Sequence, residues 1–568
     1  MSSSCLLVLT SALAPAFPGP EYLRPTIHFT RDEVSEFAAW HDIAGAFTHR
    51  GVHHIYQGEG WNHAFSTDLV NWRAGPHGPR KEHETYAGMD SFSDPCSGFV
   101  TKDDEGVVCA GFRQCGSSKG VNKTNYHDWD VPLELRCALD DNLTAWNDAA
   151  PDYLFNVTFY RPVPYDPARP WREADGHYYI LLSFDHCNVT TKKLPCDSGG
   201  GMLVAWRSPA LRGPKADWQY VGPVFSSNRT VIPGAHLAKE FVTIDYLGGL
   251  PGDPAASSGL GTRIFLNNVG GNGGGLGCCS GTTSFFVVEQ AAPGAPLVEV
   301  APQGMVDWGA FRLRDGPPSP PSAASAATAA TAAWPGIEFL DGTGSRGLSM
   351  ARTLGSEDAD QVTKPGRRVL IGWTGPPDAS TPLLNGSNSK GSAQSLPRDL
   401  SLGADRSLRQ AFVPELRALR DQHMSARGVD AWFPQPGGLQ AEVLAALPPS
   451  CATKGARCGV SMLGDGENAT AVNLDTNRGL VLVDARSQGN YIRAGPLPPP
   501  LPSSGGYVVH AYVDHCLLEL IVNNATALVV YVAPTERAGR VQLLGMPEDP
   551  EAAALDVWTL KSAAHGRS

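Results

Sequence analysis

The sequence predicts an all-β protein, and two observations lead to this prediction. First, 62 glycines and 46 prolines make up nearly a fifth of the 568 residues, which favours turn-rich structure. Second, from about residue 25 to residue 410, short aromatic and β-branched runs such as HYYILLSF (177–184) and TRIFLNNV (262–269) alternate with turn residues. No stretch of helix length in this region has helical periodicity. Short strands at this density are typical of a sandwich, a barrel or a propeller, and the pattern alone does not choose among them.

The chain is too long for one hydrophobic core and fits two domains. The segment FVPELRALR (412–420) predicts a short helix, so we expect a linker helix over 411–424. The segments after it, such as GLVLVDARS (479–487), alternate like the strands of a β-sandwich, which we expect over 425–565. Residues 316–335 are of low complexity and predict a disordered surface insertion.

The N-terminus and the glycosylation motifs indicate a secretory route. Residues 5–14 form a short apolar run before Pro15, which suits a signal peptide over residues 1–19, although the usual positive charges are missing. The run is too short to span a bilayer. Eight Asn-x-Ser/Thr sequons follow, at Asn122, Asn142, Asn156, Asn188, Asn228, Asn385, Asn468 and Asn524. We therefore expect a secreted or vacuolar protein.

Twelve cysteines agree with an oxidising compartment. Removal of Cys5 with the signal peptide would leave eleven, so at least one thiol is expected to be free. The easiest local pairs are Cys451 with Cys458 and Cys187 with Cys196, whereas the adjacent Cys278 and Cys279 cannot be assigned.

Charge and motifs exclude several other classes of function. A net charge of -12 without a basic cluster argues against nucleic acid and against an anionic membrane surface. The chain has no CxxC or HExxH motif, so a zinc site is unsupported. The glycine-rich loop VGGNGGGLG (269–277) lacks GK[ST] and precedes another strand-like run, which indicates a hairpin loop rather than a phosphate site.

Residues 39–72 carry the residue types that a neutral sugar requires. Asp42 precedes GAFTHRGVHHIYQ (45–57), which predicts a hairpin with a turn at His49-Arg50-Gly51. Gln57 and the WNHAFSTDLVNW segment (61–72) then supply flat aromatic faces and uncharged hydrogen-bonding groups. An aspartate in such a position is more often a turn or capping residue, but the aromatic and amide residues around Asp42 favour a functional role.

This stretch resembles the opening of glycoside hydrolase family 32, the invertases and fructan hydrolases. Trp40 to Gly45 stands for the family's Trp-Met-Asn-Asp-Pro-Asn-Gly motif, Ile55 to Gln57 for a hairpin ending in Tyr-Gln, and 61–72 for Trp-Gly-His-Ala with its Ser-x-Asp-Leu-x-x-Trp tail. His41, Ile43 and Ala44 depart from the first motif, in which only the acid and the glycine are retained. The resemblance implies that Asp42 is the nucleophile of a retaining glycosidase.

The second acid that the resemblance implies is Asp166. The family has an Arg-Asp-Pro motif before an aromatic residue and a hairpin, and Asp166, Trp171 and the Asp175-Gly176 turn follow in that order. Tyr165 replaces the arginine, while Arg161 and Arg169 are close enough in sequence to substitute for it. An Asp-Pro pair is also a common turn. The rival Asp94-Pro95 is rejected because Cys96-Ser97-Gly98 resembles a family motif that precedes the second acid.

The third acid is Glu240, the only glutamate between Glu173 and Glu289. Its surroundings match the family's Glu-Cys-Pro-Asp motif weakly. On a strand it would share a face with Ala238 and Val242, and such apolar neighbours would raise the pKa of its carboxyl group, as a general acid requires. The alternative is a surface glutamate paired with Lys239, but adjacent residues on a strand face opposite sides.

Four further segments resemble family motifs and extend the resemblance from residue 39 to residue 536: VDWGAF (306–311), RRVLIGW (367–373), QSLPRDLSL (394–402) and the strand pair 511–536. The resemblance therefore implies a five-bladed β-propeller over 25–410 and a C-terminal β-sandwich. An arabinanase-like propeller hydrolase is disfavoured because those relatives lack the sandwich.

The resemblance implies a β-fructofuranosidase that releases fructose from sucrose or short fructans, with no metal or cofactor. Asp42 would attack the anomeric carbon, Glu240 would act as acid and then base, and Asp166 would bind fructose hydroxyls. The sugar would contact Trp40, His41, Gln57, Trp61, Cys96, Ser97 and Tyr165. Two alternatives remain, namely a fructosyltransferase with the same site and a sugar-binding relative whose altered motifs have impaired catalysis. Oligomeric state is not predicted.

Overall fold

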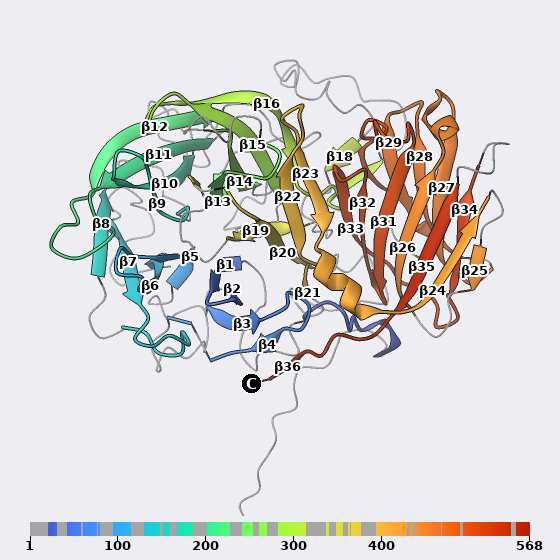
Figure 1. Cartoon of the computed structure of the whole chain (residues 1–568), viewed down its shortest axis with the longest axis horizontal. Coiled ribbons are helices and arrows are strands. Elements are labelled where there is room, and N and C mark those ends of the chain that lie inside the picture. The colour runs from blue at the N-terminus through green and yellow to red at the C-terminus, as the bar shows by residue number, and fades with distance from the viewer. Residues whose placement is uncertain are drawn as a thin grey trace, which may run out of the picture.

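The structure is a computed structural model, and it is built almost entirely of β-strands (Figure 1). It describes residues 21–30, 43–57, 61–76, 78–79, 95–114, 130–147, 152–158, 167–185, 201–227, 241–253, 261–269, 282–313, 337–339, 348–355, 362–363, 365–375, 393–428, 432–434, 439–466, 468–488, 492–546 and 553–567. Within this part of the chain, no helix is long and apolar enough to cross a membrane.

Five small antiparallel sheets form the blades of a propeller, each with its first strand at one edge of the sheet. Blade I contains β1 (Ile43–His49), β2 (Val52–Gln57), β3 (Asn62–Ser66) and β4 (Arg73–Ala74). Blade II contains β5 (Pro95–Lys102), β6 (Val108–Gln114), β7 (Asp130–Cys137) and β8 (Asp152–Thr158). Blade III contains β9 (Trp171–Arg172), β10 (Tyr178–Asp185), β11 (Gly201–Ser208) and β12 (Gln219–Ser227). Blade IV contains β13 (Phe241–Gly248), β14 (Arg263–Val269), β15 (Thr282–Gln290) and β16 (Leu297–Met305). Blade V contains β19 (Ser349–Leu354), β20 (Val369–Thr374), β22 (Arg398–Leu402) and β23 (Leu408–Phe412), with β21 (Ala393–Gln394) paired to β20.

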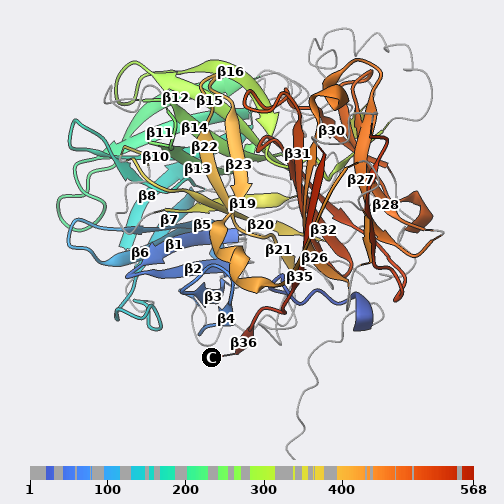
Figure 2. The same cartoon turned by 45° about the vertical axis from the view of Figure 1, so that its right-hand side comes forward.

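Two larger sheets form a β-sandwich beside the propeller (Figure 2). The eight-stranded sheet runs in the order β18 (Ile337–Phe339), β17 (Phe311–Leu313), β30 (Ile492–Pro496), β29 (Leu480–Asp484), β28 (Thr470–Asp475), β27 (Arg457–Gly464), β34 (Arg540–Leu544) and β25 (Trp432–Pro434). The six-stranded sheet runs in the order β24 (Arg420–Arg427), β35 (Ala554–Leu560), β26 (Gln440–Leu447), β31 (Tyr507–Asp514), β32 (Leu517–Val522) and β33 (Thr526–Tyr531). Alternate residues such as Val443, Val460 and Val509 are fully buried in a shared core, as the alternating pattern predicts. The predicted fold class is therefore confirmed.

Short 3₁₀ helices are the helical elements of the described chain: η1 (Glu21–Leu23), η5 (Pro414–Leu419), η6 (Pro449–Ala452) and η7 (Arg486–Gln488). The linker helix predicted over 411–424 is wrong in length and type. The chain is still in β23 at Phe412, and β24 begins at Arg420, where the backbone pairs with β35 instead of continuing a helix. Leu416 and Leu419 are buried, which explains the helical pattern over so short a segment.

Two strands inside the predicted propeller range of 25–410 belong to the sandwich. β17 pairs with β30 through Arg312 and Arg493, and β18 continues the same sheet. Conversely, β36 (Gly566–Arg567) runs parallel to β4 at the outer edge of blade I. Such pairings join segments that are far apart in sequence, so no local pattern indicates them. The predicted signal peptide (1–19) and insertion (316–335) lie outside the described residues.

Local predictions about turns and disulfides agree with the structure where it describes them. Arg50 and Gly51 both have positive φ, 51° and 74°, as a two-residue hairpin turn between β1 and β2 requires. Cys451 and Cys458 form the predicted disulfide, and Cys516 is free and buried. Cys187, Cys196, Cys278 and Cys279 lie outside the described residues.

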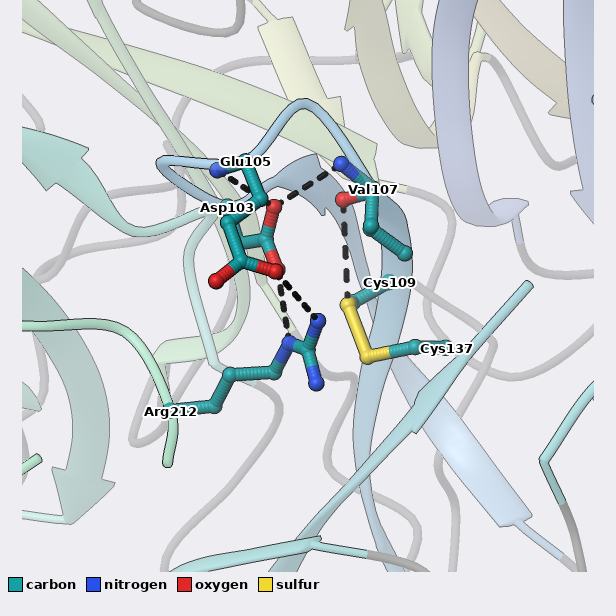
Figure 3. The surroundings of a disulfide bond; sticks show 6 residues. All are labelled: Asp103, Glu105, Val107, Cys109, Cys137 and Arg212. Atoms are coloured by element: carbon teal, nitrogen blue, oxygen red, sulfur yellow. Dashed lines mark hydrogen bonds and ion pairs between the residues drawn. A yellow bond between two sulfur atoms is a disulfide. The ribbon is translucent and has the colours of Figure 1, made fainter. Parts of the chain in front are cut away.

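A further disulfide, Cys109–Cys137, joins β6 to β7 within blade II (Figure 3). Nearby, Asp103 Oδ1 accepts hydrogen bonds from the backbone N–H groups of Glu105 (2.9 Å) and Val107 (2.8 Å). Asp103 Oδ2 accepts one from Arg212 Nε of blade III at 2.7 Å. Asp103 therefore stabilises the turn after β5 internally and also links it to blade III.

A chain of buried charged groups joins the propeller to the sandwich. Arg398 of blade V donates to Glu519 Oε2 of β32 at 2.7 Å and lies 3.3 Å from Asp307 Oδ2. Glu519 Oε1 lies 3.0 Å from His28 Nε2, and Asp514 Oδ2 of β31 lies 2.7 Å from His28 Nδ1. The side chains of all these residues are fully buried. Glu519 also accepts the backbone N–H of Leu396 at 2.8 Å, so the network holds main chain as well.

The protonation of this network follows from its geometry. Burial by itself would lower the pKa of His28, but its hydrogen bonds to Asp514 and Glu519 raise that pKa to about 9. His28 is therefore a cation at neutral pH, paired with two carboxylates. Burial raises the pKa of Asp307, against the attraction of Arg398 and the N–H groups of Gly309 and Val529. The interface thus holds positive and negative groups in direct contact, with little water to screen them.

We predict that Arg398→Met lowers the free energy of unfolding by about 3–5 kcal/mol, because it removes the buried cation that contacts both Asp307 and Glu519. Arg367→Met is the matched control. Arg367 also contacts two carboxylates, Asp399 and Glu415, but its side chain is 42% exposed, so its loss should cost at most about 1 kcal/mol. Urea denaturation of both variants measures the difference, and equal losses would contradict the assignment.

Candidate functional site

The three predicted acids, Asp42, Asp166 and Glu240, lie outside the described residues, but the residue after each of them is described. Ile43 begins β1, Phe241 begins β13, and Pro167 forms a bridge with Leu182 of β10. β1 contacts β5 and β19, and β13 contacts β10 and β19, so these inner strands of different blades are neighbours. Figure 1 shows the labels of β1, β5, β13 and β19 around the middle of the propeller. The chain thus enters the first strands of blades I and IV directly after Asp42 and Glu240, and it bridges to β10 of blade III directly after Asp166.

Gln57 is the predicted sugar-binding residue that the structure describes most fully. It ends β2, opposite Ile43 of β1 and Asn62 of β3. Its side chain is completely buried, yet neither amide atom has a hydrogen-bond partner among the described residues, and the same holds for Nδ2 of Asn62. A buried polar group without a partner costs about 1–3 kcal/mol, so such groups mark places where polar atoms of another molecule are expected. Gln57 is paired with Ile43, the residue that follows Asp42, and Asn62 lies one strand further out.

Trp61, also predicted to contact sugar, is completely buried between blades I and II. Its ring lies 5.6 Å from that of Tyr56 and 5.5 Å from that of Phe112. Its backbone is in the left-handed region with φ of 48°, and its carbonyl accepts the N–H of Gly78 at 2.9 Å. These contacts give Trp61 a packing role, and its predicted contact with sugar stays a prediction.

The remaining predicted contacts cannot be placed. Cys96 and Ser97 lie in β5, at the inner edge of blade II, but their side chains are outside the description. Trp40, His41 and Tyr165 lie outside the described residues altogether.

Two contacts that the sequence does not reveal hold the inner strands together. Arg352 of β19 donates through Nε to the carbonyl of Ile43 at 3.2 Å, where β1 has an irregular register between Ile43 and Gly45. Asp245 of β13 accepts hydrogen bonds from the backbone N–H of Thr353 at 2.7 Å and from its hydroxyl at 2.6 Å. Blade V is therefore tied to blade I beside Asp42 and to blade IV a few residues after Glu240.

The histidine of the WNHAF segment is a structural residue. His63 stacks on Tyr56, with ring centroids 4.7 Å apart, and its Nδ1 donates to the carbonyl of Pro76 at 3.2 Å. Its Nε2 then accepts from Nδ1 of His54 at 2.9 Å. Burial lowers the pKa of His63 to about 4, against the pull of the Pro76 carbonyl. Burial, with repulsion from His63, His49 and His53, lowers the pKa of His54 to about 2. Both rings are therefore neutral at physiological pH, and they are hydrogen-bonded to each other.

No group of three or more His, Cys, Asp or Glu side chains among the described residues could hold a metal ion. The absence of a cofactor stays an expectation from the sequence.

This chain is similar to known proteins in structure but not detectably in sequence. No family model matches the sequence, and no curated protein matches it. Solved structures match over nearly the whole chain. The fructan 1-exohydrolase IIa of Cichorium intybus is 14% identical, with a TM-score of 0.64 over 96% of this chain and 99% of that one. The exo-inulinase of Aspergillus awamori is 16% identical, with a TM-score of 0.63 over 95% and 99%. The GH32 β-fructofuranosidase of Bombyx mori is 13% identical, with a TM-score of 0.61 over 96% of both chains.

This chain has the fold of glycoside hydrolase family 32. The match includes both the propeller and the sandwich, because it covers 95–96% of this chain. The family 32 fold is what the motifs from residue 39 to residue 536 predict, and at these identities the likeness speaks for the fold.

The sequence does not single out Arg352 and Asp245, and there is a physical reason for this. Asp245 reads as one polar residue within an apolar strand, and Arg352 as one charge in a short strand. A charged residue inside a strand pattern is the signal that could have pointed to them, because such a group is buried only with a partner.

We predict that His63 makes the stability of the protein fall as pH decreases. Its folded pKa of about 4 lies below the ordinary value of 6.5, so the unfolded chain binds more protons below pH 6.5. The loss between pH 8 and pH 5 should be about 2 kcal/mol from this residue. His63→Gln, which does not titrate, should lose about that much less over the same range in urea denaturation. An equal loss in both proteins would contradict the neutral pair.

Proposed function

We propose that this protein is a retaining glycoside hydrolase of the β-fructofuranosidase type, which releases fructose from sucrose or short fructans. The observation that carries the proposal is the match of fold over about 96% of the chain to enzymes named for this activity. Neighbours of the same kind include a fructan 1-exohydrolase in complex with 1-kestose and a β-fructofuranosidase in complex with sucrose.

Two features of this chain support the proposal beyond the fold. Asp42 and Glu240 immediately precede the first strands of blades I and IV, and Asp166 immediately precedes a bridge to blade III, so side chains from three distant segments are expected near one another. Beside the first of these strands, the buried amides of Gln57 and Asn62 offer uncharged donors and acceptors suited to sugar hydroxyls.

The proposed reaction has two steps. The Asp42 carboxylate attacks the anomeric carbon of the fructosyl unit, while the Glu240 carboxylic acid gives its proton to the glycosidic oxygen, which leaves with the rest of the sugar. The ester between fructose and Asp42 is then hydrolysed: the Glu240 carboxylate takes a proton from water as the water oxygen attacks the same carbon, and fructose leaves. Asp166 holds fructose hydroxyls throughout. Two inversions at one carbon retain its configuration.

One observation favours a second candidate, a sugar-binding relative with impaired catalysis. Ile43 and Ala44, which replace polar or turn-forming residues of the first motif, are completely buried among apolar side chains. They offer no hydrogen bonds to orient Asp42 or a sugar. Loss of one preorganised donor typically costs about 10²- to 10³-fold in rate, so a weak enzyme and a lectin are both compatible with this change.

We predict that Asp42→Asn and Glu240→Gln each lower the rate of fructose release from sucrose, 1-kestose or inulin by at least about 10³-fold. Asp141→Asn is the matched control, because Asp141 is exposed and pairs with Arg50 at the protein surface. The measurement is free fructose per enzyme per unit time, at equal folded concentration.

The outcomes separate the two candidates. Activity in wild type and Asp141→Asn but not in the two variants supports the hydrolase. Activity that survives in Glu240→Gln would mean that another group is the acid. If folded wild type releases no fructose yet binds 1-kestose by calorimetry, the protein is a binding module. Fructosyl-oligosaccharides in place of free fructose would indicate transfer.

We also propose the secretory route for this protein. Of the sequon residues, Asn142 and Asn524 are described and exposed, Asn524 in the turn between β32 and β33, so both side chains are accessible for attachment of a glycan. Expressed in a eukaryotic host, the full chain should appear glycosylated in the medium, and a chain lacking residues 1–19 should remain unglycosylated in the cell. Asn142→Gln and Asn524→Gln should each remove one glycan mass. A full chain retained in the cytosol would contradict the proposal.

A further inference from the structure

Arg169 is a buried cation that links three blades of the propeller. It lies before β9 in blade III and is 4% exposed. Its Nη2 donates to the carbonyl of Ala46 in β1 and, at 3.2 Å, to the carbonyl of Thr353 in β19. The guanidinium carbon also lies 5.7 Å from the ring centre of Phe47 on β1. One side chain of blade III therefore holds the main chain of blades I and V.

Asp245 of blade IV completes the arrangement through Thr353. The backbone N–H and the hydroxyl of Thr353 donate to Asp245, and its carbonyl accepts from Arg169, so the two charged groups hold one residue from both sides. Burial lowers the pKa of Arg169 to about 10; the attraction of Asp245 opposes this, and repulsion from Arg352 and Arg368 adds to it. Arg169 stays protonated at neutral pH and keeps its donors.

The linked residues lie shortly after the proposed catalytic acids in the chain. Ala46 is four residues after Asp42, Arg169 three after Asp166, and Asp245 five after Glu240. The nucleophile and acid of a retaining glycosidase must stand about 5–5.5 Å apart. A displacement of about 1 Å between reacting groups can cost about 10²-fold in rate. The rate of the proposed reaction therefore depends on how these segments are positioned relative to one another.

We propose that Arg169, with Asp245 as its counter-charge, is a positioning residue of the hydrolase: it sets the separation of the segments that follow the three acids in the chain. The inference rests on the proposed function. It also gives a role to a cation close to the position where Tyr165 stands instead of the arginine of the family motif.

The test compares kcat and KM for sucrose in wild type, Arg169→Met, Arg169→Lys and a control, Arg172→Met. Arg172 lies on the same blade, but its side chain is 50% exposed and pairs with Asp104 at 2.9 Å. We expect Arg169→Met to lower kcat by about 10- to 100-fold with KM changed less than about threefold. Arg169→Lys should recover part of kcat, since one ammonium group donates hydrogen bonds but lacks the planar fork. Arg172→Met should resemble wild type.

A second comparison separates positioning from mere stabilisation. Arg169→Met removes one positive charge that attracts the buried Asp245 carboxylate, so adding Asp245→Asn should restore part of the melting temperature toward that of wild type. The double variant should nevertheless keep the low kcat, because the bonds to Ala46 and Thr353 are still missing.

The results distinguish this inference from the proposed function. If wild type releases fructose and Arg169→Met keeps kcat within about twofold, the positioning role is wrong and the hydrolase stands. If kcat returns together with the melting temperature in the double variant, Arg169 has only a structural role. If folded wild type and Arg172→Met both release no fructose from sucrose or inulin, the proposed function fails and the positioning role fails with it.

Discussion

The fold depends most on the buried ionic contacts between propeller and sandwich. Arg398, His28 and the pair Asp514 and Glu519 come from three segments far apart in the chain, and the side chain of each is fully buried against another. A buried charge without its partner is strongly destabilising, so these groups tolerate only the arrangement in which all of them meet. Apolar surfaces of the two domains could pack in several ways, whereas this network specifies one. Asp307 adds backbone contacts to Gly309 and Val529, which continue the link into β33.

A second layer of polar contacts connects the blades with one another. Arg352, Asp245 and Thr353 bind main-chain and side-chain groups of neighbouring inner strands, and they do so beside the positions where the predicted acids stand in the chain. Each blade alone is a small sheet with exposed edges and faces. Inter-blade packing and these few hydrogen bonds convert five small sheets into one rigid scaffold, on which groups from distant segments can be held at a fixed separation.

The same sequence features turned out to have different physical roles in the structure. In the WNHAF segment, Trp61 and His63 looked like sugar-binding residues because of their chemistry, yet their rings pack against Tyr56 and His54 of blade I and Phe112 of blade II. Gln57 retains the character expected of it, a buried amide with no partner among the described residues. Alternation on a strand explains the difference. Neighbouring strand residues face opposite sides, so Tyr56 and His63 lie on one side of blade I and Gln57 and Asn62 on the other.

The sequence by itself determined the features that are local: the β-rich composition, the hairpin turn at Arg50-Gly51, the Cys451–Cys458 disulfide and the order of motifs that predicts a propeller followed by a sandwich. It also marked VDWGAF, QSLPRDLSL and the strand pair at 511–536 as meaningful without indicating why. Only the tertiary structure showed that Asp307, Arg398, Asp514 and Glu519 from these motifs meet in one network. It likewise decided that β17 and β18 join the sandwich and that Arg169 reaches blades I and V. The reason is physical, because pairing between charges or strands hundreds of residues apart is decided by which surfaces bury one another, and no local pattern contains that information.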